Sequence, residues 1–220
     1  MLSAIVAALH RQGQTVGVLK PAETGCAAGP DGQLIPQDAV QLRYFSGCQL
    51  DMRVICPIVL SEPLAPLVAA RRAAVCIDTE QLVDAHASVA ATHDITCVEG
   101  AGGLLVPIAS GVTFADLAAR LEALVLVVVG SKLGAINHAL LTIRYARSVG
   151  LPVLSYVINF PTAEPDVAAR TNVDVLTECC GPPLGVMPHL GEVTMTAECR
   201  ERLADAAAAH IRLDELLVAC

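Results

Sequence analysis

The sequence predicts an α/β fold with a mostly parallel β-sheet covered by helices on both faces, in three layers. Short apolar segments alternate with amphipathic segments of helical length along the whole chain. The strand-like segments are apolar throughout, which is typical of parallel strands buried on both faces. We find no linker, internal repeat or shift in composition, so the 220 residues are expected to form a single domain, 1–220.

The order of the predicted elements follows from apolar periodicity and from glycine and proline. Gly13 and Gly150 end two of the helices, and Pro57 interrupts one strand. The segment 25–36 is rich in glycine and proline and is predicted to be a loop. It lies in the connection 21–37, whose length is often functional. The predicted strands are 15–19, 54–60, 94–98, 124–129, 153–158 and 184–186. The predicted helices are 2–11, 38–45, 79–91, 114–121, 135–148, 166–179 and 198–210.

Composition and charge exclude several classes of function. The net charge is −8 and no basic run is longer than Arg71 and Arg72, which argues against a nucleic-acid partner. The longest apolar run, 124–129, is too short to span a bilayer. Segment 1–9 lacks the basic start and the cleavage site of a signal peptide. The nine cysteines are odd in number and include no CxxC pair, so we expect reduced thiols and a cytoplasmic protein. The short apolar run also leads us to expect no membrane partner.

The run ValGluGlyAlaGlyGlyLeuLeuValPro, at 98–107, is the most informative segment of the chain. It puts Glu99 just beyond a predicted strand, with Gly100, Gly102 and Gly103 directly after it. Ligands of open α/β sheets bind at the carboxyl ends of the strands. A carboxylate beside backbone that can approach phosphate closely predicts a magnesium-nucleotide site.

Three further residues could belong to that site, and each has a simpler interpretation. Lys20 ends the predicted strand 15–19 and can neutralise phosphoryl oxygens, or it can point to solvent. Thr24 can bind a substrate or stabilise a turn. Asp38 begins a predicted helix, where it can be an N-cap or pair with Glu99 as a metal ligand.

Two later strands also end in polar segments. The backbone N–H groups at the start of the helix 135–148 suit an anion such as a carboxylate. Asn159 follows the strand 153–158, and its amide can read the edge of a base or cap the turn. All these positions lie at the carboxyl ends of predicted strands, which favours one shared site.

The chain resembles the dethiobiotin synthetase family, and the resemblance extends over nearly its whole length. The matching segments are LysProAlaGluThrGly (20–25), Asp38 with the residue after it, SerGluProLeuAlaPro (61–66), the run 98–107, LysLeuGlyAlaIleAsnHisAlaLeuLeuThr (132–142), ValIleAsn (157–159) and GlyValMetPro (185–188). The segments 98–107 and 132–142 together are quite specific. This resemblance implies a P-loop NTPase-like fold.

The resemblance also implies a reaction and a set of site residues. ATP drives ring closure of 7,8-diaminononanoate with carbon dioxide to dethiobiotin, in biotin biosynthesis, through a carbamate that is phosphorylated. Mg²⁺ would be bound by Asp38 and Glu99, Lys20 would be catalytic, and a homodimer is implied. The substrate-binding residues would be Thr24, Gly134, Ala135, Ile136 and Asn137. The nucleotide would contact Asp38, Glu99, Gly100, Ala101, Gly102, Asn159, Phe160, Pro188, His189 and Leu190.

The sequence departs from the family pattern in two places. The family begins with a strand and a GxxxxxGKT phosphate loop, and Met1 aligns just beyond that loop, so the 220 residues alone are expected to bind Mg-ATP weakly. The family's Asn-Asp pair is Asn159-Phe160 here. Two alternatives stay open: a non-catalytic protein that binds 7,8-diaminononanoate, and another P-loop amidoligase or ATPase.

Overall fold

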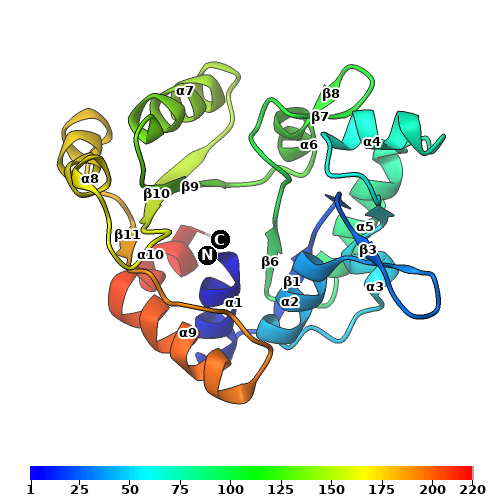
Figure 1. Ribbon diagram of the computed structural model, residues 1–220, viewed down its shortest axis with the longest axis horizontal. Coiled ribbons are helices and arrows are strands. Elements are labelled where there is room, and N and C mark those ends of the chain that lie inside the picture. The colour runs from blue at the N-terminus through cyan, green and yellow to red at the C-terminus, as the bar shows by residue number, and fades with distance from the viewer. Residues whose placement is uncertain (220) are drawn as a thin grey trace. The chain divides into compact units, whose positions relative to one another are not determined.

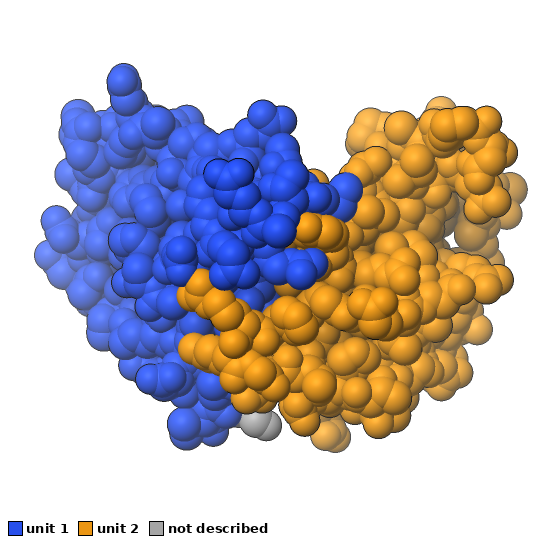
Figure 2. Space-filling view, turned by 90° about the horizontal axis from the view of Figure 1, so that it is seen from below, with its two compact units in different colours: residues 1, 3–8, 123–220 blue, residues 2, 9–122 orange. Residues whose placement is uncertain are grey.

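The computed structural model describes residues 1–219. Their contacts divide the chain into two compact units, coloured separately in Figure 2. Unit 1 contains residues 1, 3–8 and 123–220, and unit 2 contains residues 2 and 9–122. The single domain expected over 1–220 stays a prediction.

Unit 2 is built around a pair of parallel strands. Strand β1 (Val16–Leu19) pairs with β6 (Ile95–Val98), and Leu19 lies opposite Val98. Helices α2 (Gln37–Ser46), α3 (Met52–Ile55) and α5 (Thr79–Ala90) pack on β1, as can be followed in Figure 1. Unit 2 also contains three short strand pairs and two further helices. The pairs are β2 (Ala22–Glu23) with β5 (Ile58–Val59), β3 (Ala27–Ala28) with β4 (Leu34–Ile35), and β7 (Pro107–Ala109) with β8 (Val112–Thr113). The helices are α4 (Pro66–Arg72) and α6 (Phe114–Arg120).

Unit 1 contains a three-stranded parallel sheet with the order β11-β10-β9. Its strands are β9 (Val125–Gly130), β10 (Val153–Asn159) and β11 (Gly185–Met187). Its helices are α7 (Ala135–Ser148), α8 (Val167–Cys180), α9 (Ala197–His210) and α10 (Leu213–Ala219). Helix α7 packs on β9 and β10 as well as on α8, and α9 packs on β11. Helix α1 (Leu2–Arg11) contributes residues to both units.

Each unit has its own apolar core, which supplies most of the stabilising free energy. In unit 2, Ile58, Leu82, Ile108 and Leu117 belong to one buried cluster. In unit 1, α7 and α8 bury Ile143 and Leu176 against Val127, Val129 and Ile158 of the sheet. The polar residues that are candidates for a ligand site lie outside these cores, at the ends of the strands and helices.

The structure confirms the α/β fold and its parallel strands. The helices expected at 2–11 and 135–148 have those bounds, and the other expected helices differ at their ends. The strand expected at 54–60 is wrong in its first part, because Asp51 caps the short helix α3 by accepting a hydrogen bond from the Arg53 amide at 2.8 Å. The loop expected at 25–36 contains the antiparallel pair β3–β4.

Sequence patterns missed the shortest elements. Helix α4 begins with Pro66 at its first position, which is a helix-start signal, yet it spans only seven residues. Two-residue strands such as β2 are too short to show any periodicity. Within residues 1–219, the eight described cysteines are free thiols, and we find no helix of sufficient length and apolar character to cross a membrane.

Candidate active site

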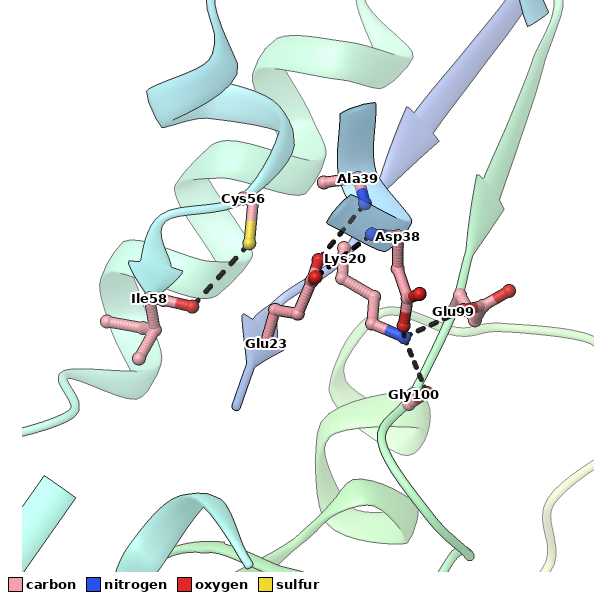
Figure 3. Close-up of polar contacts among 8 residues, drawn as sticks. All are labelled: Lys20, Glu23, Asp38, Ala39, Cys56, Ile58, Glu99 and Gly100. Carbon is pink, nitrogen blue, oxygen red and sulfur yellow. Dashed lines mark hydrogen bonds and ion pairs between the residues drawn. The ribbon is translucent and has the colours of Figure 1, made fainter. Parts of the chain in front are cut away.

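Lys20 and Glu99 lie side by side at the carboxyl ends of β1 and β6. They directly follow the paired residues Leu19 and Val98, and the Glu99 amide donates to the Leu19 carbonyl at 2.9 Å. The ammonium of Lys20 lies 2.7 Å from Glu99 Oε1. Figure 3 marks this ion pair with a dashed line. The parallel register of the two strands therefore creates this ion pair.

Asp38 joins the pair from the second position of α2. Its Oδ2 lies 3.0 Å from Lys20 Nζ. The side chain of Lys20 is only 5% exposed, whereas that of Asp38 is 56% exposed and that of Glu99 34%. The interpretation of Asp38 as an N-cap is wrong, because the N-cap is Pro36, and the solvent-facing interpretation of Lys20 is wrong as well.

The two carboxylates determine the charge of Lys20. Burial lowers the pKa of the Lys20 ammonium, but Glu99 and Asp38 outweigh burial, so its pKa lies above the ordinary lysine value. Lys20 is therefore a fixed cation at neutral pH. Its Nζ also lies 3.5 Å from the carbonyl oxygen of Gly100.

Glu23, which sequence analysis did not single out, supports α2 from strand β2. Its Oε1 accepts a hydrogen bond from the Asp38 amide at 2.9 Å, and its Oε2 accepts one from the Ala39 amide at 3.0 Å (Figure 3). The pKa of Glu23 lies above the ordinary glutamate value, chiefly because the side chain is buried, although these two hydrogen bonds lower it. The only signal in the sequence was indirect. A helix preceded by Pro36 has no capping side chain of its own, so a distant acceptor such as Glu23 has to bind its first amides.

The remaining expected residues of unit 2 lie close in sequence to Lys20 and Glu99. Thr24 is half-buried after β2, and in the described part of the chain its hydroxyl has no hydrogen-bond partner. Gly102 has a φ of +83°, and a Cβ atom there would lie 2.9 Å from Val106 Cγ2. Both observations require glycine at 102. Ala101 packs against the core of unit 2.

The expected nucleotide residues of unit 1 meet where β10 and β11 end. Asn159 lies opposite Met187, and the Phe160 amide donates to the Met187 carbonyl at 3.0 Å. The next residues along the chain, Pro188, His189 and Leu190, therefore begin beside Asn159 and Phe160. Within residues 1–219, the Asn159 side-chain amide has no hydrogen-bond partner, so its donor and acceptor remain available.

The start of α7 lies at the same end of the unit 1 sheet. The Ser131 amide donates to the Asn159 carbonyl at 2.8 Å. Gly134 is the N-cap of α7 with a φ of +89° and offers no side-chain cap. Ala135 is buried, Ile136 is half-buried, and Asn137 is exposed in the first turn. The structure thus groups the expected site residues into two sets, one in each unit.

A buried polar network that the sequence did not reveal supports the loop before α7. Asn172 of α8 is 3% exposed and donates to Ser131 Oγ at 3.1 Å and to the Lys132 carbonyl at 3.0 Å. Ser131 Oγ in turn donates to the Ala169 carbonyl at 2.8 Å. A buried polar network of this kind fixes one loop conformation.

The chemistry of the unit 2 site is that of a cation between two carboxylates. Among the described residues, no cluster of three or more His, Cys, Asp or Glu side chains could hold a metal ion. Asp38 and Glu99 nevertheless provide two partly exposed carboxylates that contact the same ammonium. Magnesium commonly takes one or two protein carboxylates and completes its shell with phosphate oxygens and water.

Comparisons with known proteins identify the family. The family described as an AAA domain matches residues 1–201. The ATP-dependent dethiobiotin synthetase of Thermodesulfovibrio yellowstonii is 34% identical over 98% of this chain and 91% of its own length. The corresponding enzyme of Bacillus subtilis is 32% identical over 98% of this chain and 90% of its own length. That of Saccharopolyspora erythraea is 40% identical over 79% of this chain and 75% of its own length.

A solved structure supports the fold alone. The MinC:MinD cell division protein complex of Aquifex aeolicus aligns with a TM-score of 0.53 at 14% identity, covering 94% of this chain and 88% of that chain. The sequence relatives carry the assignment, because their identity exceeds 30% over most of both chains. The chain therefore belongs to the ATP-dependent dethiobiotin synthetase family.

Proposed function

We propose that the protein closes the ureido ring of dethiobiotin from 7,8-diaminononanoate, carbon dioxide and ATP. The observation that carries the proposal is the Lys20 ammonium, buried between Asp38 and Glu99 at the carboxyl ends of parallel strands. Family membership supplies the reaction, since the relatives are named ATP-dependent dethiobiotin synthetases.

The proposed reaction has three steps. One amine of the substrate forms an N–C bond to carbon dioxide and loses a proton, giving a carbamate. The γ-phosphoryl group of ATP moves to a carbamate oxygen, and ADP leaves. The second amine attacks the carbonyl carbon, the C–O bond to phosphate breaks, and phosphate and a proton are released as the ring closes.

Lys20 stabilises the negative charge on the transferring phosphoryl oxygens in the second step. Phosphoryl transfer depends mainly on positioning and on charge stabilisation. The raised pKa of Lys20 supports this role, because the ammonium stays protonated while it is buried. A fixed cation needs no reorganisation at the moment of reaction.

The carboxylates of Asp38 and Glu99 fit a magnesium ion that is bound together with ATP. Each carboxylate contacts Lys20 and is partly exposed, so each retains capacity to bind a second cation. Bound magnesium would neutralise part of the phosphate charge. The protein itself contributes by holding the carboxylates of Asp38 and Glu99 next to the same ammonium of Lys20.

We assign the remaining residues to substrate and nucleotide. Thr24 and the start of α7, residues 134–137, would bind the diamine and its carboxylate, the latter through N–H groups that begin a helix. Asn159, Phe160 and residues 188–190 would contact the adenine, a role that the unpaired Asn159 amide supports. Ala101, Gly100 and Gly102 would let backbone approach the phosphates.

We also propose a homodimer in the cytoplasm. A dimer is a property that the family resemblance implies, and its check is the mass in solution by light scattering. The described cysteines are all free thiols, which agrees with a reducing compartment.

The test is product formation from 7,8-diaminononanoate, bicarbonate and Mg-ATP, followed by mass spectrometry. The assay is run on this chain with and without ATP. Dethiobiotin that forms only in the presence of ATP supports the proposal. Absence of product, with the diamine still bound, would instead favour the non-catalytic binding protein.

A further inference from the structure

Helix α2 begins without a capping side chain of its own. Its N-cap residue, Pro36, makes no side-chain cap hydrogen bond. The first N–H groups of any helix have no partner inside that helix and must find one elsewhere. In α2, Glu23 supplies both of its carboxylate oxygens to the amides of Asp38 and Ala39.

Glu23 is itself held firmly by strand β2. The residue is 6% exposed and lies opposite Val59 in the parallel pair β2–β5. Its carbonyl accepts a hydrogen bond from the Leu60 amide at 2.9 Å. Its carboxylate is therefore a fixed acceptor that ties the start of α2 to a strand, and its negative charge suits the positive end of the helix.

Asp38 donates its backbone amide to Glu23, and its side chain forms an ion pair with Lys20. The Asp38 side chain is 56% exposed, so burial by neighbouring side chains does not fix its position. Two contacts do: the side chain forms an ion pair with Lys20 at 3.0 Å, and the backbone amide of Asp38 donates a hydrogen bond to Glu23 Oε1 at 2.9 Å. Occupation of the first amides by Glu23 also removes the start of α2 as a place for a phosphate group.

We infer that Glu23 is a positioning residue that acts through Asp38 and sets the affinity of the site for a divalent cation. The inference rests on the proposed function, which assigns Asp38 to magnesium. Partners that orient a ligating carboxylate typically change metal affinity or activity by about 10- to 100-fold when they are lost. In this inference Glu23 acts through the backbone of Asp38 and is not itself assigned to the substrate or the cation.

The test is a double-mutant cycle with Glu23→Gln, Asp38→Asn and the combined variant. Gln has the same size as Glu and keeps one acceptor oxygen, but its NH2 group faces one of the two amide donors of α2. One of the two hydrogen bonds to the start of α2 is therefore lost. The first readout is the dissociation constant of Mn²⁺ in the presence of ADP, measured by electron paramagnetic resonance. The second is the Mg²⁺ concentration that gives half-maximal turnover.

Glu23→Gln is expected to raise both values about tenfold in the wild-type background, with a smaller effect on kcat at saturating Mg²⁺. In the Asp38→Asn background the same change is expected to have no further effect, since coupled residues are not additive. Equal factors in the two backgrounds, or no change in either one, would overturn the inference.

Two further measurements separate positioning from folding. Amide hydrogen exchange at Asp38 and Ala39 is expected to accelerate in Glu23→Gln while exchange in β1 stays unchanged. Asp78→Ala is the matched control, because Asp78 caps α5 in the same unit by accepting from the Glu80 amide at 2.9 Å. It is expected to lower the melting temperature but leave Mn²⁺ affinity unchanged.

The outcomes also distinguish the inference from the proposed function. Absence of dethiobiotin formation by the wild-type protein contradicts the proposed function, while the Mn²⁺ cycle still reports on Glu23 and Asp38. Normal turnover with an additive cycle leaves the function standing and removes the role assigned to Glu23. If Glu23→Gln fails to fold, Glu23→Asp provides the same comparison with a shorter carboxylate.

Discussion

The ammonium of Lys20 lies 2.7 Å from a carboxylate oxygen of Glu99, so the residue directly after β1 is paired with the residue directly after β6. Asp38 completes the arrangement from α2 at 3.0 Å. A lysine that is buried in this way stays charged only because the two carboxylates compensate the loss of water. The pairing thus places a permanent positive charge at the edge where open sheets bind ligands.

Replacement of Lys20 tests this charge. Lys20→Gln is expected to lower kcat by roughly 10²- to 10³-fold, because a preorganised donor to the transition state is lost. The KM for ATP is expected to change much less. Initial-rate kinetics on dethiobiotin formation measure both constants.

A surface cation provides the control for Lys20. Arg71 of α4 is exposed, and Arg71→Gln removes the same charge. It is expected to leave kcat within about twofold of the wild-type value. Equal effects of the two substitutions would show that net charge, and not the position of Lys20, determines the rate.

Asn159 is predicted to contribute to nucleotide binding. Asn159→Ala removes a side-chain amide at the end of β10 that has no partner within residues 1–219. The KM for ATP is expected to rise by about tenfold at nearly constant kcat, as expected for the loss of one hydrogen-bonding group. An unchanged KM for ATP would exclude Asn159 from the adenine site.

Asp94 is predicted to make the stability of unit 2 depend on pH. Hydrogen bonds from the Thr15 hydroxyl at 2.6 Å and from the Thr15 amide at 2.9 Å hold the pKa of Asp94 below its ordinary value. A carboxyl with a lowered folded-state pKa stabilises the fold above its unfolded pKa of about 3.9, and this stabilisation is lost as the pH falls through the folded pKa.

Asp94→Asn is therefore expected to flatten the decrease of the unfolding free energy as the pH falls below about 4. Urea titrations at several pH values measure the slope. Asp84→Asn, at an exposed position of α5, is the control with the same change in charge. If the curves of Asp94→Asn and wild type run parallel, the pair with Thr15 does not contribute to acid sensitivity.

Asn172 is predicted to stabilise unit 1 through its buried hydrogen bonds. Asn172→Ala removes donors to Ser131 Oγ and to the Lys132 carbonyl. The unfolding free energy is expected to fall by about 2 kcal/mol, since buried acceptors lose their partners. Thr171→Ala, on the exposed side of α8, is expected to change it by less than about 0.5 kcal/mol. Equal losses would contradict the role of the network.

Sequence reasoning anticipated the site in unit 2 because its residues end strands that carry a clear apolar signal. The segment before Lys20 and the segment before Glu99 both read as buried strands, and parallel strands bring their carboxyl ends together. The ion pair itself was not predicted. It depends on the exact register of Leu19 against Val98, which no local pattern encodes.

Glu23 and Asn172 escaped prediction for a related reason. Each acts on a backbone group distant in sequence, Glu23 on the amides of α2 and Asn172 on the Lys132 carbonyl. Local periodicity reports which face of an element is buried, but not which distant polar group a buried side chain reaches. The last two residues of the short helix α3, 54–55, were assigned to a strand because apolar residues fit both periods over so few positions.

The most direct test of the central claim follows labelled carbon from bicarbonate into product. The account predicts that ¹³C appears in the ureido carbonyl of dethiobiotin only when 7,8-diaminononanoate and ATP are both present, with one ADP formed per ring closed. Consumption of ATP without labelled dethiobiotin, or labelled dethiobiotin at an undiminished rate from Lys20→Gln, would contradict it.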